Sequence, residues 1–323
     1  MKKFTLLILL LLLTTSCSSL KKIEQTKELM GTVVTITVYN ENKGTAEKAI
    51  EAAFKEIERI ENLLTNFKNT SQVYLLNENG NIDNASNELI YVIGKSLRYG
   101  DISRGAFDIT VQPILDLYTH SFEELERPPT YQEIKETSKV VGYENIYIKN
   151  KEIKFTKQGT KITLGGIAKG YAIDKAIELL DMKGIEHALV NAGGDMRAIG
   201  NKGEKNWSIA LQNPRKKQNY IAAIQLNNKA IATSGDYERF FDDNKKFHHI
   251  VDPRTGYSAT ELISVTITAD KAIDADALAT SVFVLGKEKG LELIESIDNV
   301  EGLLITEDKE IVKSTGFEYI EKK

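Results

Sequence analysis

Polar residues that could do chemistry gather in a few short segments, and one of them lies late in the chain. Asp276 and Thr280 stand four residues apart, so on a helix they share one face. Carboxylate and hydroxyl oxygens suit Mg²⁺, which takes few protein ligands and completes its shell with water and substrate phosphates. The structural alternative is an aspartate favoured by the helix dipole and a threonine bonded back to its own helix.

A glycine-rich segment at residues 164–170 could bind an anion. Its adjacent glycines, Gly165 and Gly166, let backbone N–H groups approach a ligand closely. The start of the predicted helix that follows adds partial positive charge, and Lys169 adds a full one. A phosphate or pyrophosphate is the natural ligand, and an ordinary tight turn is the alternative.

Two adjacent histidines, His248 and His249, precede an Asp-Pro-Arg-Thr-Gly turn at residues 252–256. Histidine is the side chain best suited to proton transfer near neutral pH. Segments 105–110 and 191–195 also place glycines close to a carboxylate. Each of them is either part of a functional site or an ordinary turn. Residues 232–236 contain a serine but lack the Gly-x-Ser-x-Gly elbow, which argues against serine catalysis.

The elements that must position these residues are both helices and strands. A β-branched run predicts a strand at 32–39, and apolar residues at helical spacing predict a long helix up to Leu64, with Thr45 as its N-cap. Further helices are expected at about 88–99, 171–182, 274–285 and 287–297, further strands at 187–191, 207–211, 221–226 and 262–268, a hairpin over 146–155, and a loop with a short helix over 118–143. This mixture favours an α+β or mixed α/β fold, and no strand–GxGxxG–helix unit indicates a Rossmann fold.

The N-terminus resembles a bacterial lipoprotein signal. Two lysines precede an apolar run at residues 4–13, which is too short to span a membrane comfortably, and the only cysteine, Cys17, follows. We expect a signal peptide over 1–16, lipidation of Cys17, a tether over 17–27 and a location on the extracytoplasmic face of the cell membrane. Plain secretion with a spare cysteine is the alternative.

The bulk composition excludes several classes of function. With Cys17 lipidated, no thiol remains for a disulfide, a cysteine-bound metal or a thiol nucleophile. Lys+Arg total 42 and Asp+Glu total 46, a net charge of -4, which argues against nucleic acid as the main partner.

Taken together and in order, these segments resemble the FAD:protein FMN transferase (ApbE) family. The motifs that carry the resemblance lie at residues 30–32, 105–108, 164–170, 191–195, 233–235, 249–253 and 275–280. They place one transferase domain at 28–323. The resemblance implies two lobes of antiparallel or mixed sheet, related to the T-fold, with helices around a central FAD cleft. Many members of this family are also lipoproteins.

The resemblance also implies a role for each site residue. Mg²⁺ would be held by the Gly166 carbonyl, Asp276 and Thr280, and His249 would be the general base. FAD would be contacted by Met30, Phe67, Ala106, Phe107, Asp108, Thr163, Lys169 and Val251. The chain departs from the family at Thr163, where Asp is usual, which puts one FAD contact in doubt. It also has Phe67 where Tyr is frequent, which keeps the stacking face and loses the hydroxyl.

The implied reaction moves FMN from FAD to a Thr (or Ser) hydroxyl of a partner protein and releases AMP. Acceptors of this family carry a motif like Asp-x-x-Thr-x-Ala-Thr, and the expected partner is a flavoprotein subunit of a membrane redox complex. This chain lacks that motif, so we expect it to be the enzyme and not the acceptor. The alternatives are a pyrophosphatase that splits FAD into FMN and AMP, a non-catalytic FAD-binding lipoprotein and a general uptake lipoprotein.

Overall fold

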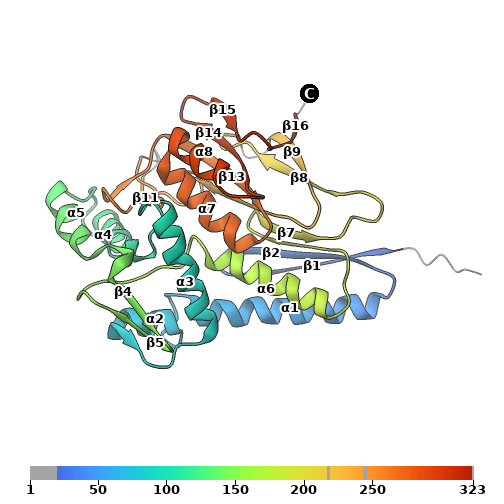
Figure 1. The fold of residues 1–323 in the computed structure, drawn as a ribbon, viewed down its shortest axis with the longest axis horizontal. Helices are drawn as coiled ribbons and strands as arrows, with labels where there is room; N and C mark the ends of the chain where they lie inside the picture. Colours follow the sequence, from blue (N-terminus) through green and yellow to red (C-terminus); the bar gives the residue numbers. More distant parts are fainter. Residues whose placement is uncertain (1–19, 217–218, 243–245, 322–323) are drawn as a thin grey trace, which may run out of the picture.

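An eight-stranded antiparallel sheet forms the centre of the molecule (Figure 1). The computed structural model describes residues 20–216, 219–242 and 246–321. The strand order is β1-β2-β6-β7-β10-β13-β14-β15. These strands are β1 (Lys21–Leu29), β2 (Thr32–Asn40), β6 (Ala188–Ala192), β7 (Asp195–Ile199), β10 (Ala230–Gly235), β13 (Leu262–Ala269), β14 (Glu301–Thr306) and β15 (Ile311–Lys313).

Three small sheets accompany the central one. They pair β8 (Trp207–Gln212) and β16 (Ile320–Glu321) with β9 (Tyr220–Leu226), β3 (Asn81–Ile82) and β4 (Ile146–Lys149) with β5 (Glu152–Phe155), and β11 (Val251–Asp252) with β12 (Tyr257–Ser258). Side chains of β8 and β9, such as Trp207 and Ile224, form an apolar cluster with Ile231 and Leu303 of the central sheet. The β8–β9 sheet therefore covers one face of the central sheet.

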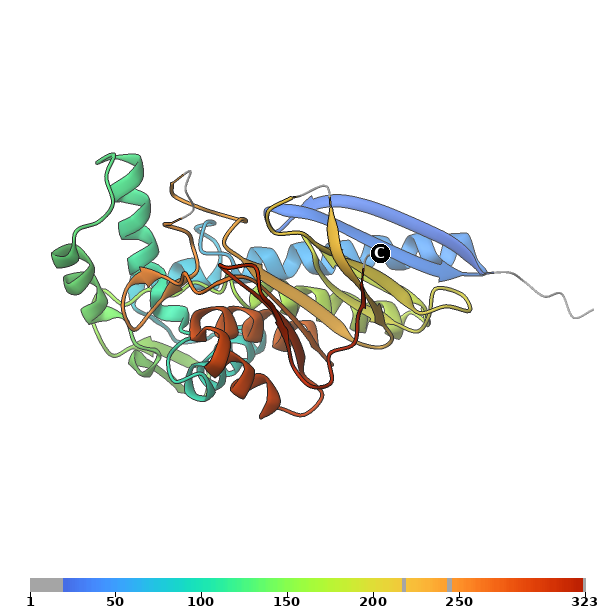
Figure 2. The same cartoon turned by 90° about the horizontal axis from the view of Figure 1, so that it is seen from above.

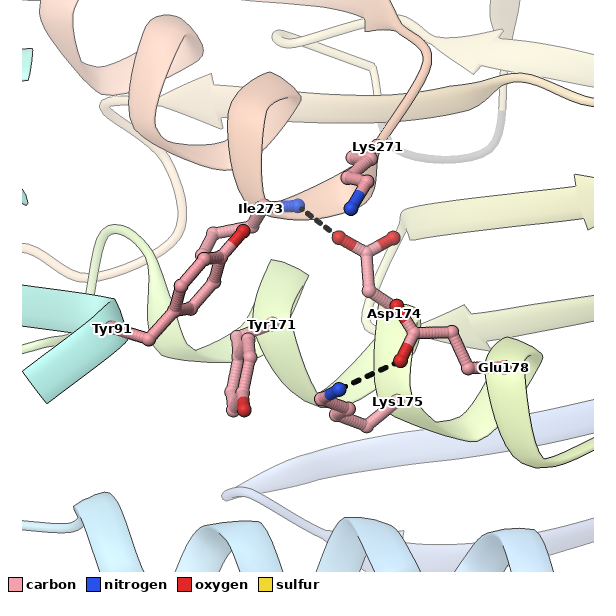
Figure 3. Close-up of a pocket in the computed structure, with 7 residues that line it drawn as sticks. All are labelled: Tyr91, Tyr171, Asp174, Lys175, Glu178, Lys271 and Ile273. Carbon is pink, nitrogen blue, oxygen red and sulfur yellow. Dashed lines mark hydrogen bonds and ion pairs between the residues drawn. The ribbon is translucent and has the colours of Figure 1, made fainter. Parts of the chain in front are cut away.

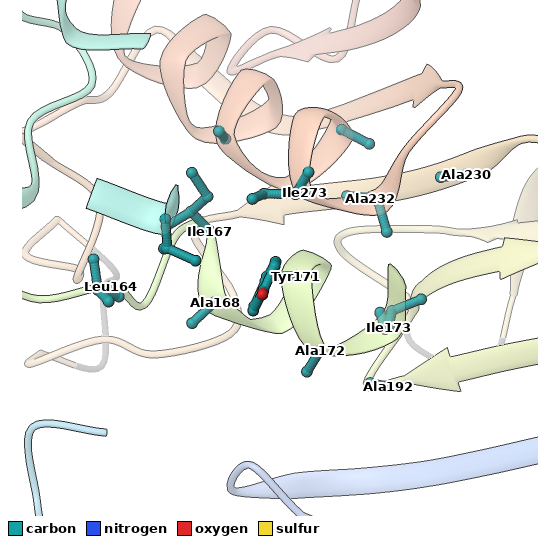
Figure 4. Packing of buried hydrophobic residues seen from close by; sticks show 14 of the residues in the cluster. Leu164, Ile167, Ala168, Tyr171, Ala172, Ile173, Ala192, Ala230, Ala232 and Ile273 are labelled. Atoms are coloured by element: carbon teal, nitrogen blue, oxygen red, sulfur yellow. The ribbon is translucent and has the colours of Figure 1, made fainter. Parts of the chain in front are cut away.

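Helices cover the other face of the central sheet. The chain forms α1 (Lys43–Leu64), α2 (Gln72–Asn79), α3 (Asn87–Ile102), α4 (Gln112–Glu123), α5 (Tyr131–Thr137), α6 (Ala168–Met182), α7 (Ala272–Leu285) and α8 (Lys287–Glu295), with short 3-10 turns η1 (Ile109–Val111), η2 (Ser138–Val140) and η3 (Tyr143–Asn145). The main core joins α1, α6 and α7 to residues of β2 such as Ile36. Figure 4 shows α6 and α7 close to strand β10, with Ile273 of α7 and Ala232 of β10 among the buried side chains.

The predicted class, mixed α/β with antiparallel strands, is confirmed. The strand expected at 32–39 is β2, the hairpin over 146–155 is β4–β5, and the late helices are α7 and α8. The expectation of Thr45 as a helix cap was wrong: Asn42 is the N-cap, and its Oδ1 accepts from the Thr45 N–H at 3.0 Å. The loop and short helix expected over 118–143 are present as the loop after α4 and helix α5, but the expected start was wrong, because Tyr118 is buried in α4.

The tether predicted over 17–27 is wrong for its described part, because residues 21–27 belong to strand β1. This strand pairs along its whole length with β2 and lies beside α1 (Figure 2). Its polarity misled the prediction: β1 is an edge strand, and charged side chains on an edge oppose pairing with other chains. Ile23 is its one buried side chain.

The predicted signal peptide and lipidated Cys17 lie outside the described residues. Within the described part of the chain, no helix combines the length and the apolar character needed to cross a membrane. Helices α4 and α5 lie at the opposite end of the molecule from the start of β1 (Figures 1 and 2).

Candidate active site

Helices α6 and α7 begin backbone to backbone. A Cβ at Gly170, in the first turn of α6, would collide with the Ala272 carbonyl and lie 2.7 Å from the Ile273 Cα. Only glycine permits this approach, which brings the glycine-rich segment before α6 against the first turns of α7. The two segments expected to form the site are therefore adjacent in space.

We expect Gly170→Ala to lower the free energy of unfolding by about 3 kcal/mol, because the neighbour it meets is backbone and cannot rotate away. Thermal unfolding measures this loss as a fall in Tm. Gly94→Ala is the matched control, since Gly94 is an exposed helical glycine of α3, and a Cβ added there would meet nothing within 4 Å. There alanine should be neutral or stabilising by up to about 1 kcal/mol. Equal Tm values for the two variants would contradict the close approach.

Asp276 carries a buried carboxylate at the junction of the two helices. Its side chain is on α7, and its Oδ2 accepts from the Gly170 N–H of α6 at 2.9 Å. Burial and the nearby Asp195 together raise the pKa of Asp276 to about 7, against the opposing effect of Lys169. The protein alone thus supplies too little positive charge to stabilise the ionised form of Asp276, and a bound cation would favour that form.

Thr280 lies one turn further along α7 and faces the glycine-rich segment. Its Oγ1 is 3.0 Å from the position of a Cβ on Gly166, and the Phe107 ring is 3.3 Å from the same point. The Thr280 hydroxyl also lies 3.3 Å from the Ser234 hydroxyl at the end of β10. The structure therefore brings together Gly166 and Thr280, two residues to which the resemblance assigns one site.

The oxygen atoms at this place suit a hard divalent cation. A carboxylate, a hydroxyl and a backbone carbonyl are the donors that Mg²⁺ and similar ions prefer. The hydrogen bond from Gly170 engages only Oδ2 of Asp276. Among the described residues, no group of three His, Cys, Asp or Glu side chains is arranged to hold a metal. The donor set fits an ion that takes much of its shell from substrate and water.

Lys169 places a cation beside the two carboxylates. Its Nζ is 3.0 Å from Oδ2 of Asp195, which itself accepts from the Thr233 N–H at 3.1 Å through Oδ1. Burial lowers the pKa of Lys169, but Asp195 and Asp276 outweigh burial and raise it. Lys169 is therefore charged at neutral pH. The sequence marked the segment of Asp195 as special but gave this carboxylate no role.

The structure separates the roles of the two histidines. His248 is buried, its Nε2 lies 2.8 Å from the Ala259 carbonyl, and its Nδ1 accepts from the Ile250 N–H at 3.3 Å. Both of its nitrogens are thus used by the backbone, so His248 is structural.

His249 keeps one nitrogen for chemistry. Its Nδ1 is 2.9 Å from the Arg239 carbonyl, which can only accept, so Nδ1 carries the hydrogen, and the lone pair of Nε2 has no hydrogen-bond donor among the described residues. Burial, together with the charges of Arg239 and Lys169, lowers the pKa of His249 to about 4. The imidazole is therefore neutral at pH 7 and can accept a proton at Nε2.

Two predicted FAD contacts have surfaces open to a ligand. Phe67 follows α1 and is 82% exposed, so its ring is open to contact with a ligand. Thr163 precedes the glycine-rich segment, and its hydroxyl accepts from the Gly165 N–H at 3.3 Å. A threonine at this position therefore shapes the turn itself.

Other predicted contacts are held mainly by the protein. Asp108 accepts from the Thr110 N–H and hydroxyl and from the Tyr143 N–H, and burial raises its pKa. Ala106 and Phe107 are buried beside it. Val251 lies 5% exposed in an apolar cluster with Tyr118.

Met30 occupies a hairpin turn. Met30 and Gly31 both have positive φ, 55° and 67°, between the paired Leu29 and Thr32. These angles match the tight turns that join right-twisted antiparallel strands. The Met30 N–H donates to Glu61 of α1 at 2.8 Å, which fixes the turn against that helix.

Sequence reasoning missed Asp174, a buried carboxylate of α6. It accepts from the Ala272 and Ile273 N–H groups of α7 at 2.9 and 3.0 Å, and from Arg197 of β7 at 2.7 Å. Figure 3 shows it beside a pocket of about 200 Å³. The available signal was a carboxylate between Ile173 and Ile177 on the apolar face of the helix.

The chain is similar to known flavin transferases along nearly its whole length. The ApbE family model matches residues 30–304. An FAD:protein FMN transferase from Haemophilus influenzae is 31% identical over 310 residues, covering 90% of this chain and 89% of the relative. One of the same description from Treponema pallidum is 29% identical, covering 89% and 85%.

Solved structures share the fold. The ApbE protein from Thermotoga maritima matches with a TM-score of 0.86 and 35% identity, covering 94% of this chain and 100% of that one. A flavin transferase ApbE from Vibrio cholerae matches with a TM-score of 0.78 and 26% identity, covering 92% and 98%.

Proposed function

This chain belongs to the ApbE family, and from that premise we propose that it is a Mg²⁺-dependent enzyme that transfers FMN from FAD to a Thr (or Ser) hydroxyl of a partner protein. Its relatives carry the description FAD:protein FMN transferase. The observation that carries the proposal is that Asp276 and Thr280 of α7 meet the glycine-rich segment, Asp276 at Gly170 and Thr280 at Gly166.

The residues that would hold Mg²⁺ are Asp276, Thr280 and the Gly166 carbonyl. Bound there, the ion supplies neutralisation of the pyrophosphate and of the charge that develops on the leaving AMP. The raised pKa of Asp276 supports this assignment, because a buried carboxylate without enough positive charge around it gains from a cation.

The chain's own groups account for the remaining steps. Nε2 of His249 accepts the proton of the acceptor hydroxyl, whose oxygen attacks the FMN phosphorus. A new P–O bond to the acceptor forms as the pyrophosphate P–O bond breaks, and AMP leaves with that electron pair. Lys169 keeps its charge beside Asp195 and adds to the attraction for the phosphates.

Binding of the flavin would use the exposed ring of Phe67 as a stacking surface. Met30, Ala106, Phe107, Asp108, Thr163 and Val251 remain predicted contacts. For Asp108 and Val251 we propose support of the surrounding loop, since their side chains are engaged within the protein.

The test of this function is the release of AMP from FAD with and without an acceptor protein carrying an Asp-x-x-Thr-x-Ala-Thr-like motif. Transfer predicts AMP release that depends on both Mg²⁺ and the acceptor. A pyrophosphatase would release AMP at the same rate without the acceptor. A flavin-storage protein would bind FAD and release none.

We further propose that Cys17 anchors the enzyme by a lipid at the extracytoplasmic face of the cell membrane. The described residues begin at 20 and β1 begins at Lys21, so an anchored Cys17 would hold the domain close to the lipid surface. A flavoprotein subunit of a membrane redox complex is then the fitting acceptor. Replacing Cys17 by Ser should release the enzyme from membranes, as fractionation measures; retention would contradict the anchor.

Magnesium should stabilise the protein more at pH 8 than at pH 5. Because the pKa of Asp276 rises from 3.8 to about 7 on folding, its contribution to stability is present at low pH and is lost as pH rises towards 7. Mg²⁺ binds the ionised form, so its apparent affinity should fall about tenfold per pH unit below 7. Tm measured with and without MgCl₂ at both pH values checks this, and a Mg²⁺ effect independent of pH would contradict it.

A further inference from the structure

Helices α6 and α7 each begin without a capping side chain of their own. The N-terminal N–H groups of a helix need acceptors when they are buried. Each helix obtains an acceptor from the other: Asp276 of α7 accepts from the Gly170 N–H of α6, and Asp174 of α6 accepts from the Ala272 and Ile273 N–H groups of α7. The two carboxylates therefore form a reciprocal cap.

Asp174 is the more constrained of the two carboxylates. It is 2% exposed, and both of its oxygens are engaged, Oδ1 by Ala272 and Oδ2 by Ile273. Arg197 of β7 donates to Oδ1 at 2.7 Å and supplies the compensating charge. The Nε of Arg197 is buried without a hydrogen-bond partner among the described residues. Burying this N–H group without an acceptor is unfavourable, which is consistent with a role of Arg197 in holding the Asp174 side chain in place.

The cap sets the position of α7 relative to the glycine-rich segment. Asp276 and Thr280 follow Ala272 by one and two turns of the same helix, so a shift of the first turn moves both. We propose that Asp174, oriented by Arg197, is a positioning residue for the metal site: its two bonds to the start of α7 hold Asp276 and Thr280 toward Gly166. This inference rests on the proposed Mg²⁺ dependence.

Asp174→Asn is the sharpest variant, because it keeps the shape of the side chain. The amide oxygen can accept from one of the two helix N–H groups, but the NH₂ is a donor and cannot accept from the other. The substitution also removes the negative charge that pairs with Arg197. We expect Mg²⁺ affinity about tenfold weaker, in the range seen when groups that orient metal ligands are lost. Transfer at saturating Mg²⁺ and the KM for FAD should change by less than about twofold.

Glu178→Gln is the matched control. Glu178 lies on the same helix and lines the same pocket, but its ion pair is with Lys175 of α6 (Figure 3). The same carboxylate-to-amide change there should leave Mg²⁺ affinity unchanged. Arg197→Lys is a second test, in which Mg²⁺ affinity is expected to fall about threefold. If Asp174→Asn does not fold, this variant tests the positioning role of Asp174.

Calorimetric titration of the full chain with MgCl₂ alone measures the affinity directly, well below the Tm of each variant. Weaker Mg²⁺ binding in Asp174→Asn with an unchanged Glu178→Gln supports the positioning role. A lower Tm with wild-type Mg²⁺ affinity would show that Asp174 only stabilises the fold and overturns the inference, while the metal site of the proposed function stands. No Mg²⁺ binding by the wild-type chain would overturn both.

Discussion

Replacing Asp276 by Asn is expected to lower FMN transfer by at least about 10³-fold while leaving the protein folded. The variant loses the only charged group among the proposed metal ligands, and stabilisation of transition-state charge by such an ion is worth several kcal/mol. Asn can still accept from the Gly170 N–H, so the bond between α6 and α7 is kept.

The same substitution should raise the stability of the metal-free protein at pH 8. Burial raises the pKa of Asp276, which means that its charged form destabilises the fold when no cation is present. A neutral amide removes this effect. Loss of activity together with an unchanged or higher Tm separates a metal ligand from a structural residue, whose loss would lower both.

Asp274→Asn is the control for this prediction. Asp274 lies two residues earlier on the same helix and binds Lys95 at 2.7 Å and the Tyr99 hydroxyl at 2.6 Å. Its replacement should leave transfer within about threefold of wild type. Both variants are compared by initial rates of flavin attachment to the acceptor across a Mg²⁺ series. Wild-type activity of Asp276→Asn would remove this residue from the metal site.

The second large effect is expected for His249. The alanine variant should slow transfer by about 10²–10⁴-fold, the usual contribution of a general base, while FAD binds as in the wild type. The reason is the free Nε2, since Nδ1 donates to the Arg239 carbonyl and holds the ring in place. The pKa of His249 is lowered to about 4, so this side chain stays neutral when the pH falls through 6.5. The wild-type rate at saturating Mg²⁺ should therefore show no loss with a midpoint near pH 6.5.

Single-turnover kinetics measure the rate of transfer, and titration with FAD measures its binding, so the two effects of His249→Ala can be separated. His120→Ala is the control, since this histidine is half-exposed on α4 and its Nδ1 lies 3.2 Å from Glu124, the residue that follows this helix. Added imidazole should restore part of the rate of His249→Ala and none of the rate of Asp276→Asn. If His249→Ala transferred FMN as fast as the wild type, another group would have to be the base.

The sequence predicted the parts of the site that depend on local periodicity. The spacing of Asp276 and Thr280 indicated one helix face, and the glycines at 165–166 indicated a turn that admits close approach. Both features follow from backbone geometry within one element. The shared role of Thr280 and Gly166 came from the resemblance and stays a prediction; the structure shows that the two residues lie close together.

What the sequence did not predict depends on pairs far apart in the chain. Asp174 bonds to residues 98 and 99 positions away, and no local pattern marks such a pair. The polar strand β1 lacked apolar alternation, because only Ile23 faces the core fully. Of the two adjacent histidines, only their backbone partners show that His248 is structural and His249 has a free nitrogen.

The most direct test of the central claim is the mass of the acceptor protein after incubation with FAD, MgCl₂ and this enzyme. We predict an increase by one FMN phosphoester per acceptor, with one AMP released for each. An acceptor of unchanged mass beside free FMN and AMP would show that water, and not a protein hydroxyl, receives the flavin phosphate, and would contradict the account.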